Sequence, residues 1–180
     1  MLSDLIILQP GAWDATTGLL DDVFIANNVM QNVASPVTLW TKPGNTVGKV
    51  TISGLDATGV YRSAFSAESW ADAPITNVIL RGVRAEFAGG GKAWSTNQTV
   101  KCPGVDARPL PAWRLYARNV QTLTLEDVRF SLAADDLRPV LHAERVERLN
   151  LDKFRFTRVP GVSEPFFTTN VSQLLRTPPE

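Results

Sequence analysis

One apolar pattern recurs along this chain, and it restricts the available folds more than any other feature. The pattern is clearest at 120–130, where the apolar residues are Val120, Leu123, Leu125, Val128 and Phe130. Leu123 and Leu125 alternate with polar residues, as in a strand that buries one face. The acidic pair Glu126–Asp127 then predicts a turn that redirects the chain before Val128.

Four other segments repeat this pattern, at 20–30, 47–57, 75–85 and 146–156. The first residues of the alternating pairs are Val23, Val50, Val78, Leu123 and Leu149, which are 27, 28, 45 and 26 residues apart. A period in this range is typical of a solenoid, in which each repeat forms one coil and stacks on its neighbours. The sequence therefore predicts an all-β parallel solenoid of five to six coils, as a single domain over residues 1–180.

A second short strand is expected in every coil, at 35–39, 63–67, 111–116, 138–142 and 164–168. Four of these segments begin at or next to a proline, which suits the first residue of a strand leaving a turn. Such strands are too short to be stable in an isolated hairpin, so they depend on stacking between coils. The tail, 171–180, ends in prolines and is expected to act as a terminal cap.

The 45-residue spacing contains an insertion at 88–110, which is polar and rich in turn residues. We expect it to project from one coil as a long loop. Two interpretations remain open: a binding loop, as insertions on solenoids commonly are, or a surface excursion without a function.

Composition excludes several classes of partner. The 18 basic and 18 acidic residues give a net charge of zero, whereas a nucleic-acid-binding protein is expected to have a basic excess. No run of 18 apolar residues occurs, so no membrane span is expected, and the first residues lack the basic region of a signal peptide. Cys102 and His142 are the only cysteine and the only histidine, which excludes an internal disulfide and a Cys/His metal cluster. We expect no cofactor.

Four segments carry a resemblance to a known family: Val-Met-Gln-Asn-Val-Ala-Ser-Pro-Val at 29–37, Gly-Asn-Thr-Val-Gly-Lys-Val-Thr-Ile at 44–52, Gly-Val-Tyr-Arg-Ser-Ala at 59–64 and Asp-Val-Arg-Phe at 127–130. They resemble the right-handed parallel β-helix of pectin lyase-like proteins. More narrowly, they resemble the C-terminal coils of bacterial family-28 glycoside hydrolases, the polygalacturonase-like enzymes. The resemblance implies a carbohydrate-related function, a polysaccharide partner, and a secreted or periplasmic location.

The catalytic motifs of that family are not intact in this chain. The family uses Asn-Thr-Asp, Asp-Asp, Gly-His-Gly and Arg-Ile-Lys. The Asp-Asp pairs at 21–22 and 135–136 lack the flanking residues, His142 is not between glycines, and the register of Arg-Ile-Lys is occupied by Thr38-Leu39-Trp40. We therefore expect a partial solenoid that lacks the family's N-terminal coils and binds polysaccharide without the family's catalytic residues.

An active hydrolase with another acid/base site is the alternative. Inverting glycoside hydrolysis needs two carboxyl groups about 6.5–9.5 Å apart, one of them protonated. The weak candidates are Glu68, His142, Asp135 and Asp136. Solvated turn acids, an exposed ion pair at Glu68 and a structural histidine are the simpler interpretations.

Candidate carbohydrate-binding residues are Trp40, Tyr61, Arg62, Glu68, Trp70 and Trp94. Aromatic rings pack on the C–H faces of pyranoses, and alternation places Arg62, Glu68 and Trp70 on one outward side if the strand runs unbroken. Packing in the core or anchoring of a loop is the alternative for each tryptophan.

The first coil is expected to expose strand edges and apolar surface, which favours pairing with another chain. The sequence therefore predicts a homodimer or larger oligomer joined through residues near 5–8 and 23–25. A purely structural, self-assembling solenoid is a third interpretation of the whole chain.

Overall fold

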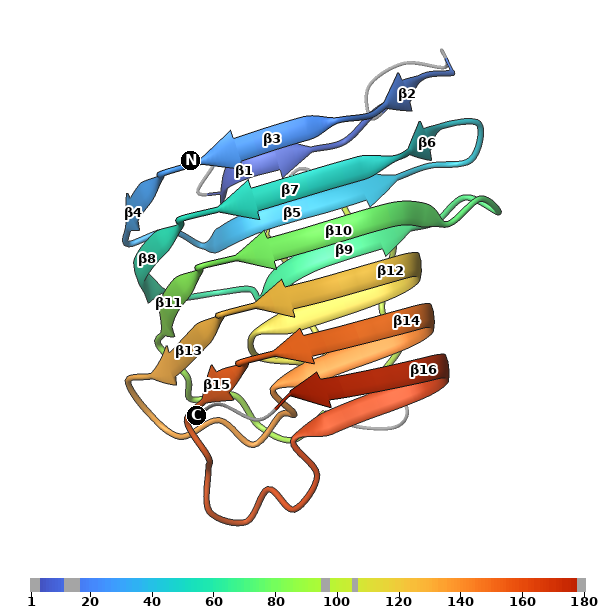
Figure 1. Cartoon of the computed structure of the whole chain (residues 1–180). Helices are drawn as coiled ribbons and strands as arrows, with labels where there is room; N and C mark the ends of the chain where they lie inside the picture. The colour runs from blue at the N-terminus through green and yellow to red at the C-terminus, as the bar shows by residue number, and fades with distance from the viewer. Residues whose placement is uncertain (1–3, 12–16, 95–97, 105–106, 178–180) are drawn as a thin grey trace.

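The repeated pattern folds into stacked coils. The computed structural model describes residues 4–11, 17–94, 98–104 and 107–177, and in them the chain forms a parallel β-solenoid of about six turns without a helix (Figure 1). The strands are β1 (Asp4–Leu8), β2 (Leu19–Leu20), β3 (Val23–Ala26), β4 (Val29–Gln31), β5 (Ser35–Thr41), β6 (Thr46–Val47), β7 (Lys49–Ser53), β8 (Asp56–Val60), β9 (Phe65–Ser69), β10 (Ile75–Arg81), β11 (Arg84–Phe87), β12 (Leu115–Glu126), β13 (Arg129–Leu132), β14 (Leu141–Asp152), β15 (Arg155–Phe156) and β16 (Phe166–Thr177). The predicted all-β solenoid is confirmed. These residues include no helix long and apolar enough to cross a membrane.

Three faces run along the solenoid. We define the front face as the strands β3, β7 and β10 together with the later parts of β12, β14 and β16. The back face consists of β1, β5 and β9 with the earlier parts of the same three long strands. The side face is a five-stranded sheet in the order β15-β13-β11-β8-β4. In Figure 1 the front and back faces lie one behind the other, from β1 and β3 at one end to β16 at the other.

The register between coils matches the sequence repeat. The first residues of the alternating pairs lie in one column, in the order Val23, Val50, Val78, Leu123, Leu149 and Leu174. The 45-residue spacing therefore lengthens a connection and leaves the strand pairing unchanged. Leu174 extends the repeat by one coil, because residues 171–177 of the expected cap belong to β16 and pair with β14. The terminal prolines on which the expectation of a cap rests lie outside the described residues.

The corner between the front and side faces has the same backbone conformation in five successive coils of the described chain. The corner residues and their φ values are Asn27 (57°), Gly54 (61°), Gly82 (57°), Asp127 (48°) and Lys153 (51°). Each corner amide donates a hydrogen bond to a carbonyl of the next coil. In the first coil Asn27 N donates to Ser53 O at 2.9 Å, and in the last of the series Lys153 N donates to Thr177 O at 3.3 Å. Glycine, and to a lesser degree asparagine and aspartate, adopts this left-handed conformation most easily. The turn predicted at Glu126–Asp127 is confirmed.

A second left-handed corner joins the back face to the front face. Asn119, Arg145 and Asn170 have φ of 53°, 52° and 55°, and each lies within one of the 12-residue strands β12, β14 and β16. Each long strand therefore bends once and supplies both faces without an intervening loop. Earlier coils use loops at this corner.

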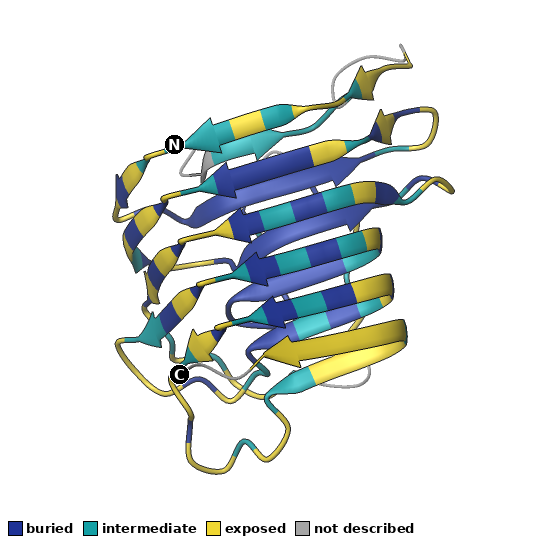
Figure 2. Cartoon of the chain, in the orientation of Figure 1, coloured by how far each residue is buried: buried dark blue, intermediate teal, exposed yellow. Residues whose placement is uncertain are grey.

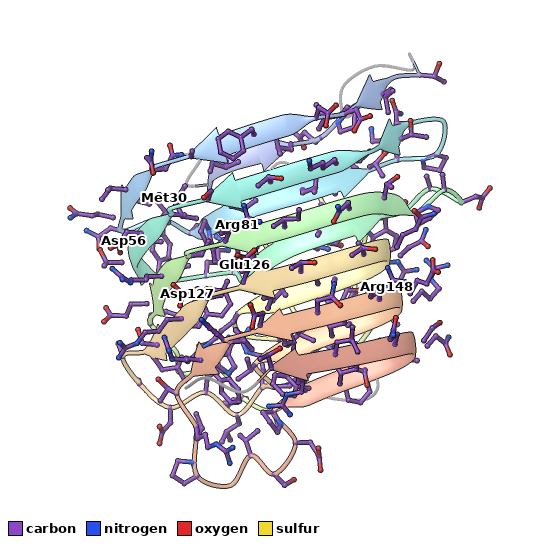
Figure 3. The ribbon with its side chains drawn as sticks, in the orientation of Figure 1. Met30, Asp56, Arg81, Glu126, Asp127 and Arg148 are labelled. Atoms are coloured by element: carbon purple, nitrogen blue, oxygen red, sulfur yellow. The ribbon has the colours of Figure 1, made fainter. Side chains whose placement is uncertain are left out.

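The core fills the space between the three faces. Inward side chains alternate with outward ones along the strands, which gives the alternating burial in Figure 2. Phe130 is 1% exposed, and its ring centroid lies 5.4 Å from that of Phe65 and 5.7 Å from those of Phe87 and Phe154. Outward charges pair between coils on the surface, as between Arg81 and Glu126 at 2.8 Å (Figure 3).

One cation is buried with these rings. The Arg114 guanidinium lies 3.0 Å from the ring centroid of Trp113, and Nη1 donates to the carbonyl of Phe130. Its Nε and Nη2 atoms have no hydrogen-bond partner among the described residues, and burial lowers the pKa of Arg114 from its ordinary value. Stacking on Trp113 offsets part of the cost of removing this charge from water.

Candidate functional site

A groove of about 850 Å³ lies on the outer surface of the back face, where the insertion ends and β14 and β16 remain uncovered. Its floor is formed by side chains of β12, β14 and β16, and its walls by the insertion and by the connection at 133–140. The described lining residues that matter most for chemistry are Trp70, Trp94, Arg118, His142, Glu144 and Phe167.

Strand alternation explains the polar floor. Arg118 pairs in register with Glu144, and Glu144 with Thr169, so these residues point outward from adjacent strands. Two residues earlier, His142 pairs in register with Tyr116 on one side and Phe167 on the other. The coil repeat thus brings a histidine, a carboxylate and a guanidinium together without any special loop.

Glu144 is the centre of this floor. Its Oε2 accepts a hydrogen bond from Arg118 Nη1 at 2.8 Å, and its Oε1 accepts one from the Tyr116 hydroxyl at 3.2 Å. Oε1 also lies 3.2 Å from His142 Nε2. The hydrogen bond from His142, with Arg118 and Tyr116 beside it, holds the pKa of Glu144 below its ordinary value against the opposite effect of burial. Burial and the nearby Glu144 raise the pKa of Tyr116, so its hydroxyl stays protonated.

Toward β9, residues of the insertion cover the outward-facing side chains of the back face. Glu68 is fully buried there, and its Oε2 accepts hydrogen bonds from Arg108 Nη2 at 2.5 Å and from Trp70 Nε1 at 2.9 Å. Burial raises the pKa of Glu68, against the lowering effect of Arg108. Leu110 packs on Ala64 and Tyr116 as a second small apolar cluster. At Arg108 and Leu110 the insertion is therefore packed onto the back face and does not project from it as expected.

An ion pair fastens both ends of the insertion. Asp136 Oδ2 accepts a hydrogen bond from Gly91 N at 3.0 Å, and the same carboxylate pairs with Arg138 at 2.7 Å. Arg138 Nη1 in turn donates to the carbonyl of Leu110 at 3.2 Å. The hydrogen bonds and the positive charge of Arg138 hold the pKa of Asp136 below its ordinary value, although its burial acts the other way. Asp136 therefore acts here as a structural anchor.

The groove walls are aromatic. Trp94 is half-buried, and its Nε1 donates to the carbonyl of Gln98 within the insertion at 3.3 Å. The Arg118 guanidinium lies 4.2 Å from the Trp70 ring centroid. Phe167 is 51% exposed, and its centroid is 4.6 Å from that of His142. Aromatic surface thus borders a floor rich in hydrogen-bonding groups.

Four of the predicted site residues meet at this place. Trp70, Trp94 and His142 line the groove, and Glu68 lies beside it, bonded to Trp70. Trp40 occupies the coil next to that of Glu68, but it is 3% exposed and its Nε1 donates to Gln9 Oε1 at 2.9 Å. Its ring faces are therefore closed to a ligand.

The other predicted residues lie elsewhere. Tyr61 and Arg62 are exposed at the corner before β9, and Asp135 is exposed at a turn. Alternation is expected to place Arg62 on the outward side of Glu68 and Trp70 only if the strand runs unbroken, and this condition is not met, because β9 begins at Phe65.

Sequence reasoning missed Arg118, Glu144 and Phe167. A signal for them exists: once the second strands of successive coils are aligned, Tyr116-Ala-Arg118, His142-Ala-Glu144 and Phe167-Thr-Thr169 fall in register. Polar and aromatic residues at alternate positions of neighbouring coils share one surface.

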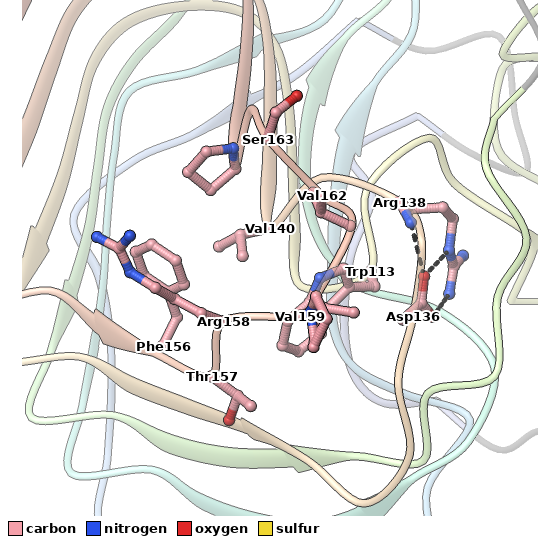
Figure 4. Close-up of a pocket in the computed structure, with 12 residues that line it drawn as sticks. Trp113, Asp136, Arg138, Val140, Phe156, Thr157, Arg158, Val159, Val162 and Ser163 are labelled. Atoms are coloured by element: carbon pink, nitrogen blue, oxygen red, sulfur yellow. Dashed lines mark hydrogen bonds and ion pairs between the residues drawn. The ribbon is translucent and has the colours of Figure 1, made fainter.

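A second cavity, of about 340 Å³, lies between the connections at 133–140 and 157–165. Figure 4 shows Trp113, Val140 and Val159 around it and the Asp136–Arg138 pair at its edge. The Asp136 carboxylate is already occupied by Gly91 and Arg138. We therefore place the candidate site in the groove, where the charged floor faces outward.

The chain matches no protein-family model, no curated protein and no solved structure. Among the residues that the structure describes, no group of three or more His, Cys, Asp or Glu side chains is placed to hold a metal ion.

Proposed function

We propose that this protein is a carbohydrate-binding β-solenoid and that its groove holds a segment of a polysaccharide or an oligosaccharide. The observation that carries the proposal is the combination of aromatic walls, Trp94 and Phe167, with the polar floor of Arg118, His142 and Glu144. Ligand sites typically combine apolar and aromatic lining with a few placed polar groups. A pyranose offers the matching surfaces, because its C–H face packs on aromatic rings and its hydroxyls bond to polar side chains.

The resemblance of the coils to polygalacturonase-like hydrolases supports the choice of a polysaccharide, and the interrupted catalytic motifs support binding without that family's reaction. We accordingly propose that the protein binds a polysaccharide of the kind that this family acts on and does not hydrolyse it with the family's catalytic residues. The first ligands to test are oligogalacturonides, followed by neutral oligosaccharides of similar length.

The test compares an aromatic residue of the groove with an aromatic residue outside it. Trp94→Ala removes a groove wall and is expected to weaken oligosaccharide binding at least tenfold, which corresponds to about 1.4 kcal/mol. Tyr61→Ala is the matched control, because Tyr61 is 54% exposed and lies on another part of the surface. Isothermal titration calorimetry measures both. Equal affinities of the two variants, or no binding to any ligand of the panel, would refute the proposal.

Hydrolysis in the same groove is a second candidate, favoured by the contact of His142 Nε2 with Glu144 Oε1 at 3.2 Å. A carboxylate that orients an imidazole is a common arrangement for a general base. This candidate predicts release of reducing ends from a polysaccharide panel and loss of that activity in His142→Gln. Binding without product formation by the unaltered protein would leave only the first proposal.

A further inference from the structure

We infer that copies of this chain associate head to tail, so that the β16 end of one solenoid stacks on the β1 and β3 end of the next. This inference goes beyond carbohydrate binding, and the two surfaces meet at Phe167, which lines the groove and also belongs to the β16 end. In Figure 1 these two ends lie at opposite extremes of the stack. Among the described strands, β1 and β3 pair only with β5 and β7, and β16 pairs only with β14. Among the described residues, β1 and β3 therefore each leave one edge unpaired at the first end, and β16 leaves one edge unpaired at the other. Such an edge is a template for pairing with another chain.

The exposed apolar residues of the two ends belong to the same columns. On the outside of the front face, one column runs Phe24, Thr51, Ile79, Thr124, Asn150 and Leu175. Its interior members are mostly polar, whereas its two ends are apolar and exposed, Phe24 at 68% and Leu175 at 49%. A second copy stacked in register places Leu175 of one molecule on Phe24 of the next.

Two more columns show the same match. The inward front column begins with Val23 and ends with Leu174, which is 43% exposed although it faces inward. On the outside of the back face, Ile7 pairs with Thr38 at one end of a column, and Phe167 pairs with His142 at the other. Head-to-tail stacking thus sets apolar residues against apolar residues in all three columns, which removes exposed apolar area from water.

Charge separates this arrangement from a two-fold dimer. In the first coil the charged side chains that the structure describes are Asp21 and Asp22, whereas the charged side chain of β16 is Arg176. Head-to-tail contact brings opposite charges together, and contact between two like ends brings like charges together. Complementary potentials favour the first arrangement and its orientation. The residues near 5–8 and 23–25, through which a homodimer or larger oligomer is expected, thus form one side of an asymmetric contact in this inference.

An asymmetric contact leaves a free end on each copy, so association is open-ended and yields short filaments that lengthen with concentration. The strands of successive copies run parallel, as they do within the chain. Since opposite charges contribute, association is expected to weaken as salt is added.

The test blocks one end at a time, with exposed residues whose replacement leaves the core intact. Phe24→Lys blocks the first end and Leu175→Lys blocks the second. Sedimentation velocity is expected to show concentration-dependent oligomers for the unaltered chain and monomers for each variant alone. An equal mixture of the two variants is expected to form a one-to-one heterodimer, because each variant retains the end that the other lacks.

Three results would overturn the inference. The first is an unaltered chain that remains monomeric at every concentration. The second is dimerisation of Leu175→Lys alone, which would indicate contact between two first ends, and the third is failure of the mixed variants to associate. Circular dichroism melting curves check that both variants fold as the unaltered chain does.

Discussion

Single residues determine how easily each coil turns, and Lys153 is the residue of the front-to-side corner series that is neither glycine, asparagine nor aspartate. Lys153 has φ of 51°, while the equivalent residues Gly54 and Gly82 carry no side chain. The left-handed conformation costs a non-glycine residue roughly 1–2 kcal/mol. Glycine avoids this cost but loses more backbone entropy on folding, which offsets part of its advantage. We expect Lys153→Gly to raise the free energy of unfolding by about 0.5 kcal/mol or more.

Urea denaturation measures this change, with Gly82→Ala as the opposite substitution at an equivalent corner. The nearest atom to an added Cβ at Gly82 is 4.0 Å away, so only the φ of 57° opposes alanine there. Gly82→Ala is expected to lower the free energy of unfolding by about 1 kcal/mol. A loss of stability in Lys153→Gly would show that the lysine side chain makes a compensating contact.

Glu144 predicts a pH dependence. The pKa of its carboxyl is lowered in the folded protein, chiefly by the hydrogen bond from His142, so the ionised group contributes stability above its unfolded pKa. That contribution is lost as the pH falls through the folded pKa, because both states then bind the proton. Near neutral pH we therefore expect Glu144→Gln to have a lower Tm than the unaltered protein. This difference in Tm is expected to shrink below about pH 4. A constant difference over this range would contradict the pairing.

At the scale of elements, the insertion depends on one buried ion pair. Asp136 is 0% exposed and joins Gly91 to Arg138, which itself bonds to Leu110. Asp136→Ala leaves Arg138 without its partner and is expected to destabilise the protein by about 3 kcal/mol and to release the insertion. Limited proteolysis is expected to cut within 92–104 much faster than in the unaltered chain.

Asp135→Ala is the matched control for that experiment. Asp135 is the preceding residue and is exposed, and the described contact it makes is through its backbone carbonyl, to Gly90 N at 2.9 Å. Its side chain is expected to be dispensable for stability and for protease resistance. Equal sensitivity of both variants would mean that the ion pair does not fasten the insertion.

The front-face strands and their turns could be predicted because they are periodic. The alternation at Leu123 and Leu125 is repeated in other coils, and each repeat independently supports the same register. The insertion has no repeat to support a prediction. Its packing rests on single long-range contacts, such as Arg108 with Glu68, 40 residues apart in the sequence, and one sequence gives no signal that joins them.

The candidate site was predicted only in part for the same reason. Trp70, Trp94 and His142 attract notice as residue types, but their meeting in one groove depends on where the insertion stops on the back face. Arg118 and Glu144 resemble ordinary surface charges until β12 and β14 are placed in register. Burial of Trp40 and of Asp136 likewise follows from tertiary cover that local patterns do not encode.

At the scale of the whole molecule, stability is distributed along one dimension, because each coil pairs only with its neighbours. A central coil is supported from both sides and an end coil from one. Phe130 in β13 contacts rings of several coils and is 1% exposed, whereas Phe166 in β16 is half-buried with a single neighbouring coil.

Truncating these two phenylalanines therefore tests the one-dimensional description. Phe130→Ala is expected to lower the free energy of unfolding by about 3–5 kcal/mol, as for other buried aromatic residues, and Phe166→Ala by less than half of that. Urea denaturation at a concentration where the protein is monomeric measures both, since stacking of a second copy would itself protect the β16 end. Equal losses in the free energy of unfolding would mean that the last coil unfolds together with the central coils as one cooperative unit. A smaller loss at Phe166 that grows with protein concentration would connect the stability of this end to the head-to-tail contact.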